Sequence, residues 1–145
     1  MSELIKLSVT VNSVIDNLDD AGLPDGDPEI NIFTTDATLS VNERMTKLVF
    51  TEAVESESIT STIYLTSDGV RLFKRGAIEA DMRFAEGACE KTIYRIGPYA
   101  FDMEIKTKRI ASTISENGGE LSLLYSMNVG GQEKNVRMKI TAKRK

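Results

Sequence analysis

The sequence predicts an all-β protein in which a single antiparallel meander closes into a barrel. Apolar and polar residues alternate with period two along most of the 145 residues, which is typical of strands that bury one face. Turn signals separate the alternating runs at short intervals, and no segment has the spacing of an amphipathic helix between cap signals. A chain of this length has room for one core, so we expect residues 1–145 to form a single domain.

The two terminal segments, 4–15 and 133–142, show clear alternation. Their apolar positions fall on one face of each strand: Ile5, Leu7, Val9 and Val11 in the first, and Val136, Met138, Ile140 and Ala142 in the last. Residues 1–60 carry 12 acidic and 3 basic side chains, whereas residues 61–145 carry 10 and 15. Because the first and last strands of a closed sheet lie together, we expect these charges to compensate each other. The alternative is an anionic partner on the basic half.

Eight further strands are expected between these two, in the order 29–40, 45–54, 59–67, 70–75, 81–87, 91–96, 99–115 and 120–129. Asp68-Gly69 is a strong signal for a two-residue hairpin. Three more turns are marked by Asn117-Gly118-Gly119, Gly130-Gly131 and Gly97-Pro98. Segments that follow one another in the sequence are therefore expected to pair as neighbours in the sheet.

The stretch between Gly76 and Gly87 is predicted to be a corner of the sheet rather than a phosphate-binding loop. Phosphate loops need closely spaced glycines that lead from a strand into a helix N-terminus. These two glycines are eleven residues apart, and no helical pattern follows either of them. We expect one strand to end at Gly76, a connection through residues 77–80, and a returning strand from Asp81.

The long segment 99–115 contains a change of parity. Its apolar residues occupy odd positions at first and even positions later: Tyr99, Phe101, Met103 and Ile105, then Ile110 and Ile114. A one-residue slip without a turn residue predicts a β-bulge or sharp bend near Thr107 to Arg109. Barrels use such bends, and closure removes the exposed edges of an open meander. A barrel of eight to ten strands can be filled by side chains or can hold one small ligand.

Three blocks of the sequence resemble a known family. They are "RGAIEADMRFAEGA", "TIYRIGPYAFDMEIKTKRI" and "GGELSLLYSMNVG". They are similar to the YwiB-like family of small bacterial β-barrel proteins, which are grouped by shape with the lipocalin-type calycins. The likeness runs from about Ile5 to Ile140 and implies a single calycin-like barrel with no established catalytic residues. The sequence departs from the expected pattern at Lys74, where arginine is expected.

Several kinds of chemistry are excluded or disfavoured by composition. Histidine is absent, which removes the commonest general base and zinc ligand and every Ser-His or Cys-His pair. Asp25, Asp27 and Glu29 alternate like calcium ligands, but Ile30 stands where an EF-hand needs glycine, so a solvated acidic loop is expected. We therefore expect no catalytic residue, no metal and no cofactor, and a protein that is not an enzyme.

The expected location is the cytoplasm. Cys89 is the single cysteine, which rules out an internal disulfide and fits a reducing compartment. No run approaches the roughly 18 apolar residues that could span a bilayer, and the N-terminus lacks a basic start followed by an apolar stretch. We therefore expect no membrane association.

Parity also predicts which side chains face the interior of the second half of the barrel. These are Met82, Phe84, Tyr94, Phe101, Met103, Tyr125, Met127 and Met138. Methionine adapts to irregular cavities, and a buried tyrosine hydroxyl needs a partner, so these residues are predicted to line a ligand site, the alternative being a packed core. Arg75 and Arg83 flank the same corner and are candidates to contact an anionic head group, the alternative being exposure to water.

The leading functional hypothesis is a non-enzymatic barrel that binds a small apolar or amphiphilic molecule. The alternative is a scaffold that acts as a homodimer or through a protein partner, with an apolar patch on strands 29–54, where both faces carry apolar residues. Single-stranded nucleic acid is a weaker hypothesis. The "KRK" end supplies charge, but the chain is acidic and its few aromatic residues fall on apolar faces.

Overall fold

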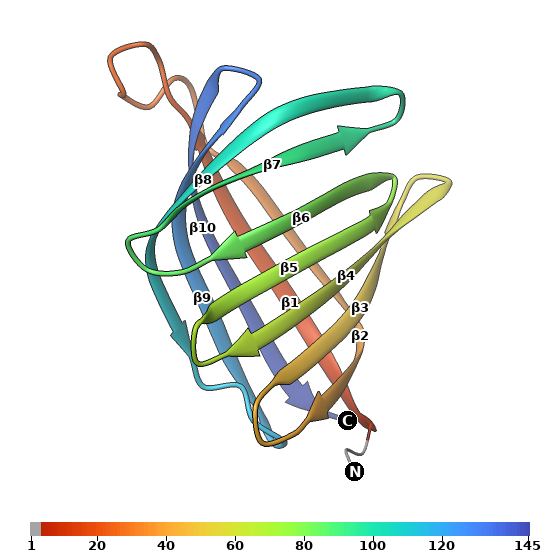
Figure 1. Ribbon diagram of the computed structural model, residues 1–145. Coiled ribbons are helices and arrows are strands. Elements are labelled where there is room, and N and C mark those ends of the chain that lie inside the picture. Colours follow the sequence, from red (N-terminus) through yellow and green to blue (C-terminus); the bar gives the residue numbers. More distant parts are fainter. Residues whose placement is uncertain (1–3) are drawn as a thin grey trace.

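The computed structural model describes residues 4–145 as ten antiparallel strands closed into a barrel (Figure 1). The strands are β1 Leu4–Asn17, β2 Glu29–Val41, β3 Thr46–Val54, β4 Glu57–Thr66, β5 Gly69–Gly76, β6 Ile78–Phe84, β7 Cys89–Ile96, β8 Tyr99–Ser112, β9 Gly118–Val129 and β10 Gln132–Arg144. Each strand pairs with its neighbours in sequence, and β1 pairs with β10 to close the ring. The predicted all-β meander and its closure are confirmed.

Two details of the predicted strands are wrong. The strand expected at 81–87 is β6, which begins at Ile78, so the connection after β5 is the single residue Ala77. The returning strand starts early because Gly76, at a φ of +118°, turns the chain where a Cβ would meet the Ser58 carbonyl oxygen. The turn between β4 and β5 consists of Ser67 and Asp68, because Gly69 is already paired with Thr66.

The predicted bulge in β8 is confirmed. The register between β8 and β9 shifts between Thr107 and Arg109. The loop between β6 and β7 docks at this irregularity: the Gly87 N–H donates to the Thr107 carbonyl at 3.0 Å, and the Thr107 N–H donates to the Ala88 carbonyl at 3.2 Å. The Glu86 carboxylate accepts a hydrogen bond from the Ile110 N–H at 2.9 Å. The bulge therefore binds the loop to β8.

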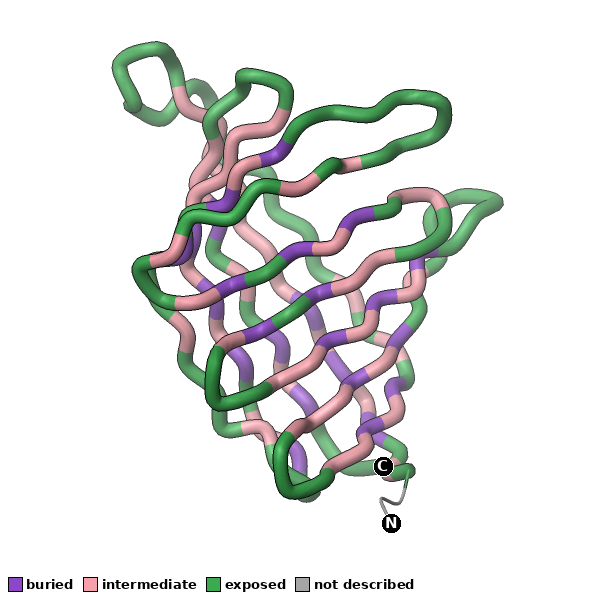
Figure 2. Tube along the Cα trace, in the orientation of Figure 1, coloured by how far each residue is buried: buried purple, intermediate pink, exposed green. Residues whose placement is uncertain are grey.

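Because all strands are antiparallel, the connections divide between two ends of the barrel. One end holds both described termini and the β2–β3, β4–β5, β6–β7 and β8–β9 connections; the half of the barrel beside it is called the closed half. Its inward side chains are almost fully buried: Leu7, Leu39, Leu48, Ile63, Leu121 and Ile140, each at most 1% exposed. The other half is called the open half. Buried positions are concentrated in the middle and lower parts of the barrel (Figure 2).

The wall of the barrel is interrupted at two seams. The β2–β3 ladder pairs only Ala37–Val41 with Thr46–Phe50, so the first part of β2 pairs with β1 alone. The ladder between β6 and β7 contains two residue pairs, Ile78 with Ile96 and Glu79 with Arg95. The β7–β8 hairpin accordingly stands off from β6 (Figure 1). The β2–β3 seam therefore lies in the open half, whereas the β6–β7 seam extends from Ala80 toward the closed end.

Candidate ligand site in the open half of the barrel

The structure places the predicted interior residues at different depths. Met82, Phe84, Met103 and Tyr125 are at most 4% exposed and belong to the core. Tyr94, Met127 and Met138 are partly buried and pack against that core from the open half. Phe101 lies at the rim and is 39% exposed. The eight residues therefore extend along the inner face of the sheet from the packed core to the rim of the barrel.

An aromatic cluster forms the floor of the open half. The rings of Phe84 and Tyr125 lie 4.7 Å apart between centroids, at an interplanar angle of 59°. Burial raises the pKa of the Tyr125 hydroxyl, and nearby Tyr94 raises it further. Burial also raises the pKa of Tyr94. Both tyrosines are thus neutral hydrogen-bond donors and acceptors at physiological pH, and no residue from 4 to 145 hydrogen-bonds to the Tyr125 hydroxyl.

A cavity of about 710 Å³ lies at the seam between β6 and β7 and is called the seam cavity. Its lining includes side chains from both faces of the sheet. Lys74 on β5 and Thr92 on β7 are inward by parity, whereas Arg75, Lys91 and Arg95 are outward. The seam cavity therefore connects the outer surface with the inner wall of the barrel.

Lys74 is a candidate functional residue that parity could have identified. It continues the inward series of Val70 and Leu72 on β5, and it lies opposite Ser61 on β4 and Ala80 on β6. Burial lowers the pKa of its ammonium group, and the Glu52 carboxylate partly offsets this effect. Within the described chain the ammonium makes no ion pair or hydrogen bond.

The two arginines predicted to contact an anion are in different places. Arg75 lines the seam cavity, and its guanidinium carbon lies 4.7 Å from the centroid of the Phe73 ring on the outer face of β5. Arg83 lines a separate cavity near the β4–β5 turn, together with Arg71 and Tyr64. One ligand head group at the seam could therefore meet Arg75 but not Arg83.

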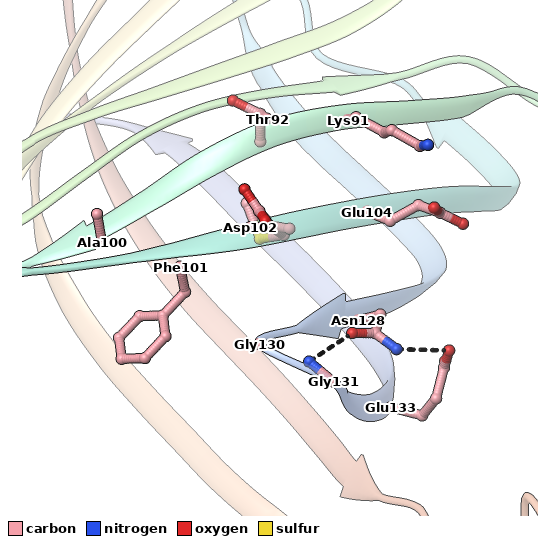
Figure 3. Close-up of a pocket in the computed structure, with 11 residues that line it drawn as sticks. Lys91, Thr92, Ala100, Phe101, Asp102, Glu104, Asn128, Gly130, Gly131 and Glu133 are labelled. Carbon is pink, nitrogen blue, oxygen red and sulfur yellow. Dashed lines mark hydrogen bonds between the residues drawn. The ribbon is translucent and has the colours of Figure 1, made fainter.

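A second large cavity, of about 780 Å³, has a different character (Figure 3). It lies beside the β9–β10 turn and is lined by the carboxylates of Asp102, Glu104 and Glu133. Asn128 organises the turn: its Oδ1 accepts from the Gly131 N–H at 2.9 Å, and its amide donates to Glu133 at 3.0 Å. Lys91 contributes one positive charge. The excess of carboxylates makes this cavity unsuitable for an anionic ligand.

Across residues 4–145, no three side chains from His, Cys, Asp and Glu gather as a metal site would require. The same part of the chain contains no helix with the length and apolar character needed to cross a membrane. The inner wall and the seam cavity present apolar side chains, hydroxyls and single charges. These are the groups that bind small organic molecules in concave sites.

Comparison with known proteins identifies relatives of this barrel. Residues 23–141 match the family model described as "Domain of unknown function (DUF1934)". The chain is 25% identical over 136 residues to the "Uncharacterized beta-barrel protein YwiB" of Bacillus subtilis (strain 168), covering 94% of this chain and 91% of that protein. The crystal structure of the ywiB protein from Bacillus subtilis matches with a TM-score of 0.85 at 24% identity, covering 99% and 95% of the two chains. The resemblance to YwiB is confirmed, and the chain belongs to the DUF1934 family.

Proposed function

We propose that the protein is a non-enzymatic binding protein that holds a small amphiphilic molecule in the open half of its barrel. The observation that carries this proposal is the contrast in burial along one inner wall. Side chains of the closed half fill the interior, whereas Tyr94, Met127 and Met138 present apolar surface that is only partly covered. Leaving apolar side chains in contact with water is unfavourable, so a ligand that covers them gains free energy.

The chemistry of the wall fits an amphiphile better than a purely apolar molecule. Methionine side chains adapt to ligands of irregular shape. Tyr94 and Tyr125 offer hydroxyls beside apolar rings, and Lys74 offers a charge at the seam. Such a combination of apolar surface with few polar groups is common in small-molecule sites. The shape that lipocalin-type calycins share, which the resemblance implies, supports the same proposal.

A cytoplasmic location is part of the proposal. Cys89 is exposed at the start of β7 and has no disulfide partner, since the chain has one cysteine. An exposed thiol is compatible with a reducing compartment. The ligand would accordingly be a cytoplasmic metabolite or lipid-derived molecule.

The first test is native mass spectrometry of protein purified from cells, which should detect a bound small molecule. The second uses N-phenyl-1-naphthylamine, a neutral probe whose fluorescence rises in apolar sites. Ser13 lies on the inner face of β1 opposite Met138, so Ser13→Trp should fill the open half and weaken probe binding at least fivefold. Ser126→Trp, on the outer face of β9, is the matched control and should leave binding unchanged. Equal loss in both variants, or no probe binding by the parent protein, would contradict the proposal.

A second candidate function is supported by an exposed apolar patch on β2. Ile30 and Ile32 are each 62% exposed and point outward, within the segment where the sequence predicts a patch. Val14 on β1 lies opposite Ile30 and extends the apolar surface. This patch could serve a homodimer or a protein partner. Sedimentation at micromolar concentration would detect a dimer, and Ile32→Lys should then dissociate it. A monomer at all concentrations that captures no partner would count against this candidate.

A further inference from the structure

Positive charge is concentrated around the seam cavity, although the chain as a whole carries a net charge of −4. The lining contains four cationic side chains: Lys74, Arg75, Lys91 and Arg95. It contains two carboxylates, Glu79 and Asp81. A cavity with this excess attracts anions, because the fields of like charges around a concave surface add.

One of the two carboxylates is already neutralised. Arg71 donates two hydrogen bonds of 2.8 Å to the Asp81 carboxylate, from Nε to Oδ1 and from Nη2 to Oδ2. This bidentate pair satisfies the carboxylate on the outer face of the sheet. Glu79, opposite Arg95 in the β6–β7 ladder, is then the remaining acidic group against four cations.

Lys74 differs from the other three cations because it faces inward. Exposed lysines extend their ammonium groups into bulk water, which incurs no desolvation cost. Burial penalises the charged form of Lys74, as the lowered pKa shows; the Glu52 carboxylate offsets only part of that cost, and within residues 4–145 no carboxylate forms an ion pair with Lys74. Its cross-strand neighbours, Ser61 and Ala80, are uncharged. A ligand anion would supply the missing partner.

The seam leads from Lys74 to the apolar wall. Two positions further along the inner face of β5 is Leu72, which pairs with Met82. On the other side of the seam, Thr92 is followed on the inner face of β7 by Tyr94. Met82 and Tyr94 are therefore the inward apolar side chains that lie next to the seam cavity along these strands. The cavity volume of about 710 Å³ lies in the range of known small-molecule sites.

We infer that the ligand carries a single anionic head, a carboxylate or a phosphate, which binds at Lys74 in the seam cavity while its alkyl tail lies against the inner wall. This inference rests on the proposed function and adds the charge class of the ligand. Arg75, Lys91 and Arg95 at the outer lip attract the anion to the seam. Lys74 then binds it inside, and Ser61 and Thr92 offer hydroxyls beside it.

The test compares four probes on the unmodified protein by isothermal titration calorimetry: decanoate, decyl phosphate, decanol and acetate. A charge-assisted hydrogen bond predicts that decanoate and decyl phosphate bind at least about tenfold more tightly than decanol. Acetate should show no binding, because it lacks a tail. Equal affinity for decanoate and decanol would overturn this inference and leave the proposed function standing. Acetate binding as tight as decanoate would overturn the amphiphile assignment. No binding by any tailed probe would overturn both proposals.

Lysine variants test which ammonium group binds the anionic head of the ligand. Lys74→Met should reduce decanoate affinity about tenfold or more and leave decanol affinity unchanged, and Lys74→Arg should retain the preference. Lys143→Met, on the exposed outer face of β10, is the matched control and should change neither. Lys91→Met at the outer lip gives a second test that does not alter the interior, with a smaller loss that disappears at high salt. A preference for decanoate that survives Lys74→Met would overturn the role of Lys74.

Discussion

The closed and open halves of the barrel use the same ten strands for different purposes. In the closed half the interior is filled, and side chains such as Leu7 and Leu121 are at most 1% exposed. In the open half the part of β2 before Ala37 has no partner on β3, and inward residues such as Met127 remain partly exposed. We infer that packing in the closed half stabilises the fold, so that the inward side chains of the open half need not be fully buried. Substitutions should therefore separate stability from binding according to the half in which they fall.

The largest expected effect is the loss of stability from a cavity in the closed half. Leu7→Ala should lower the free energy of unfolding by about 3 kcal/mol, because a fully buried leucine leaves a void in packed surroundings. Met127→Ala in the open half should cost less than about 1 kcal/mol, since its site is already partly open. Urea denaturation measures both. Equal losses would show that the two halves are packed alike.

The bulge in β8 should be the next most sensitive feature. Glu86→Ala removes the acceptor for the Ile110 N–H and should cost about 1 kcal/mol, whereas Glu86→Gln keeps an acceptor oxygen and should cost less. Hydrogen exchange at Ile110 should accelerate in Glu86→Ala. Unchanged exchange there would mean that the loop between β6 and β7 is held without this bond.

Lys74→Met should stabilise the protein by about 1 kcal/mol at pH 7. Burial lowers the pKa of Lys74 in the folded state below its ordinary value of 10.5, so the charged form opposes folding. This unfavourable contribution is complete below the folded pKa and disappears as the pH rises past 10.5. The stability difference between variant and parent should therefore shrink in alkaline solution. Thermal denaturation from pH 7 to 11 tests this, and a destabilised variant would contradict it.

The smallest effect on stability is expected for the Arg71–Asp81 ion pair, which lies on the outer face of the sheet beside the seam cavity. Hydrogen bonding from Arg71 lowers the pKa of Asp81 below its ordinary value of 3.8. The pair thus contributes stability above that value, which is lost as the pH falls through the lower folded pKa. Both side chains are about a third exposed or more, so Asp81→Asn should cost less than about 0.5 kcal/mol at pH 7 and nothing near pH 2. A larger loss of stability at pH 7 would show that the ion pair also stabilises the strands at the β6–β7 seam.

Local pattern was sufficient to predict most of this fold. Period-two alternation predicts nearly all the strands, and the parity change predicts the bulge between Thr107 and Arg109. The predicted start of β6 at Asp81 is too late, although Ile78, Ala80, Met82 and Phe84 already alternate. No local pattern predicts the seam: β6 and β7 are connected by a short loop, yet only two of their residue pairs form, and the loop bonds to Thr107 on β8.

The candidate site is harder to predict from the sequence than the fold is. Parity identifies which residues face inward, and Lys74 follows Val70 and Leu72 in that series. Depth along the barrel does not follow from parity, because it depends on the register of all ten strands. Met82 and Met127 therefore look alike in sequence, although one is in the core and the other is near the mouth. The cations of the seam cavity come from two strands, β5 and β7, which lie on either side of β6 in the folded barrel.

The most direct test of the account is a titration of protein labelled with ¹³C at the methionine methyl groups, followed by NMR with decanoate as the ligand. The account predicts saturable chemical-shift changes for Met82, Met127 and Met138 on the inner wall, and none for Met45 beside the β2–β3 connection at the closed end. Lys74→Met should weaken these changes. Absence of any shift at Met127 and Met138 at saturating decanoate, or a shift at Met45 alone, would contradict a ligand site in the open half of the barrel.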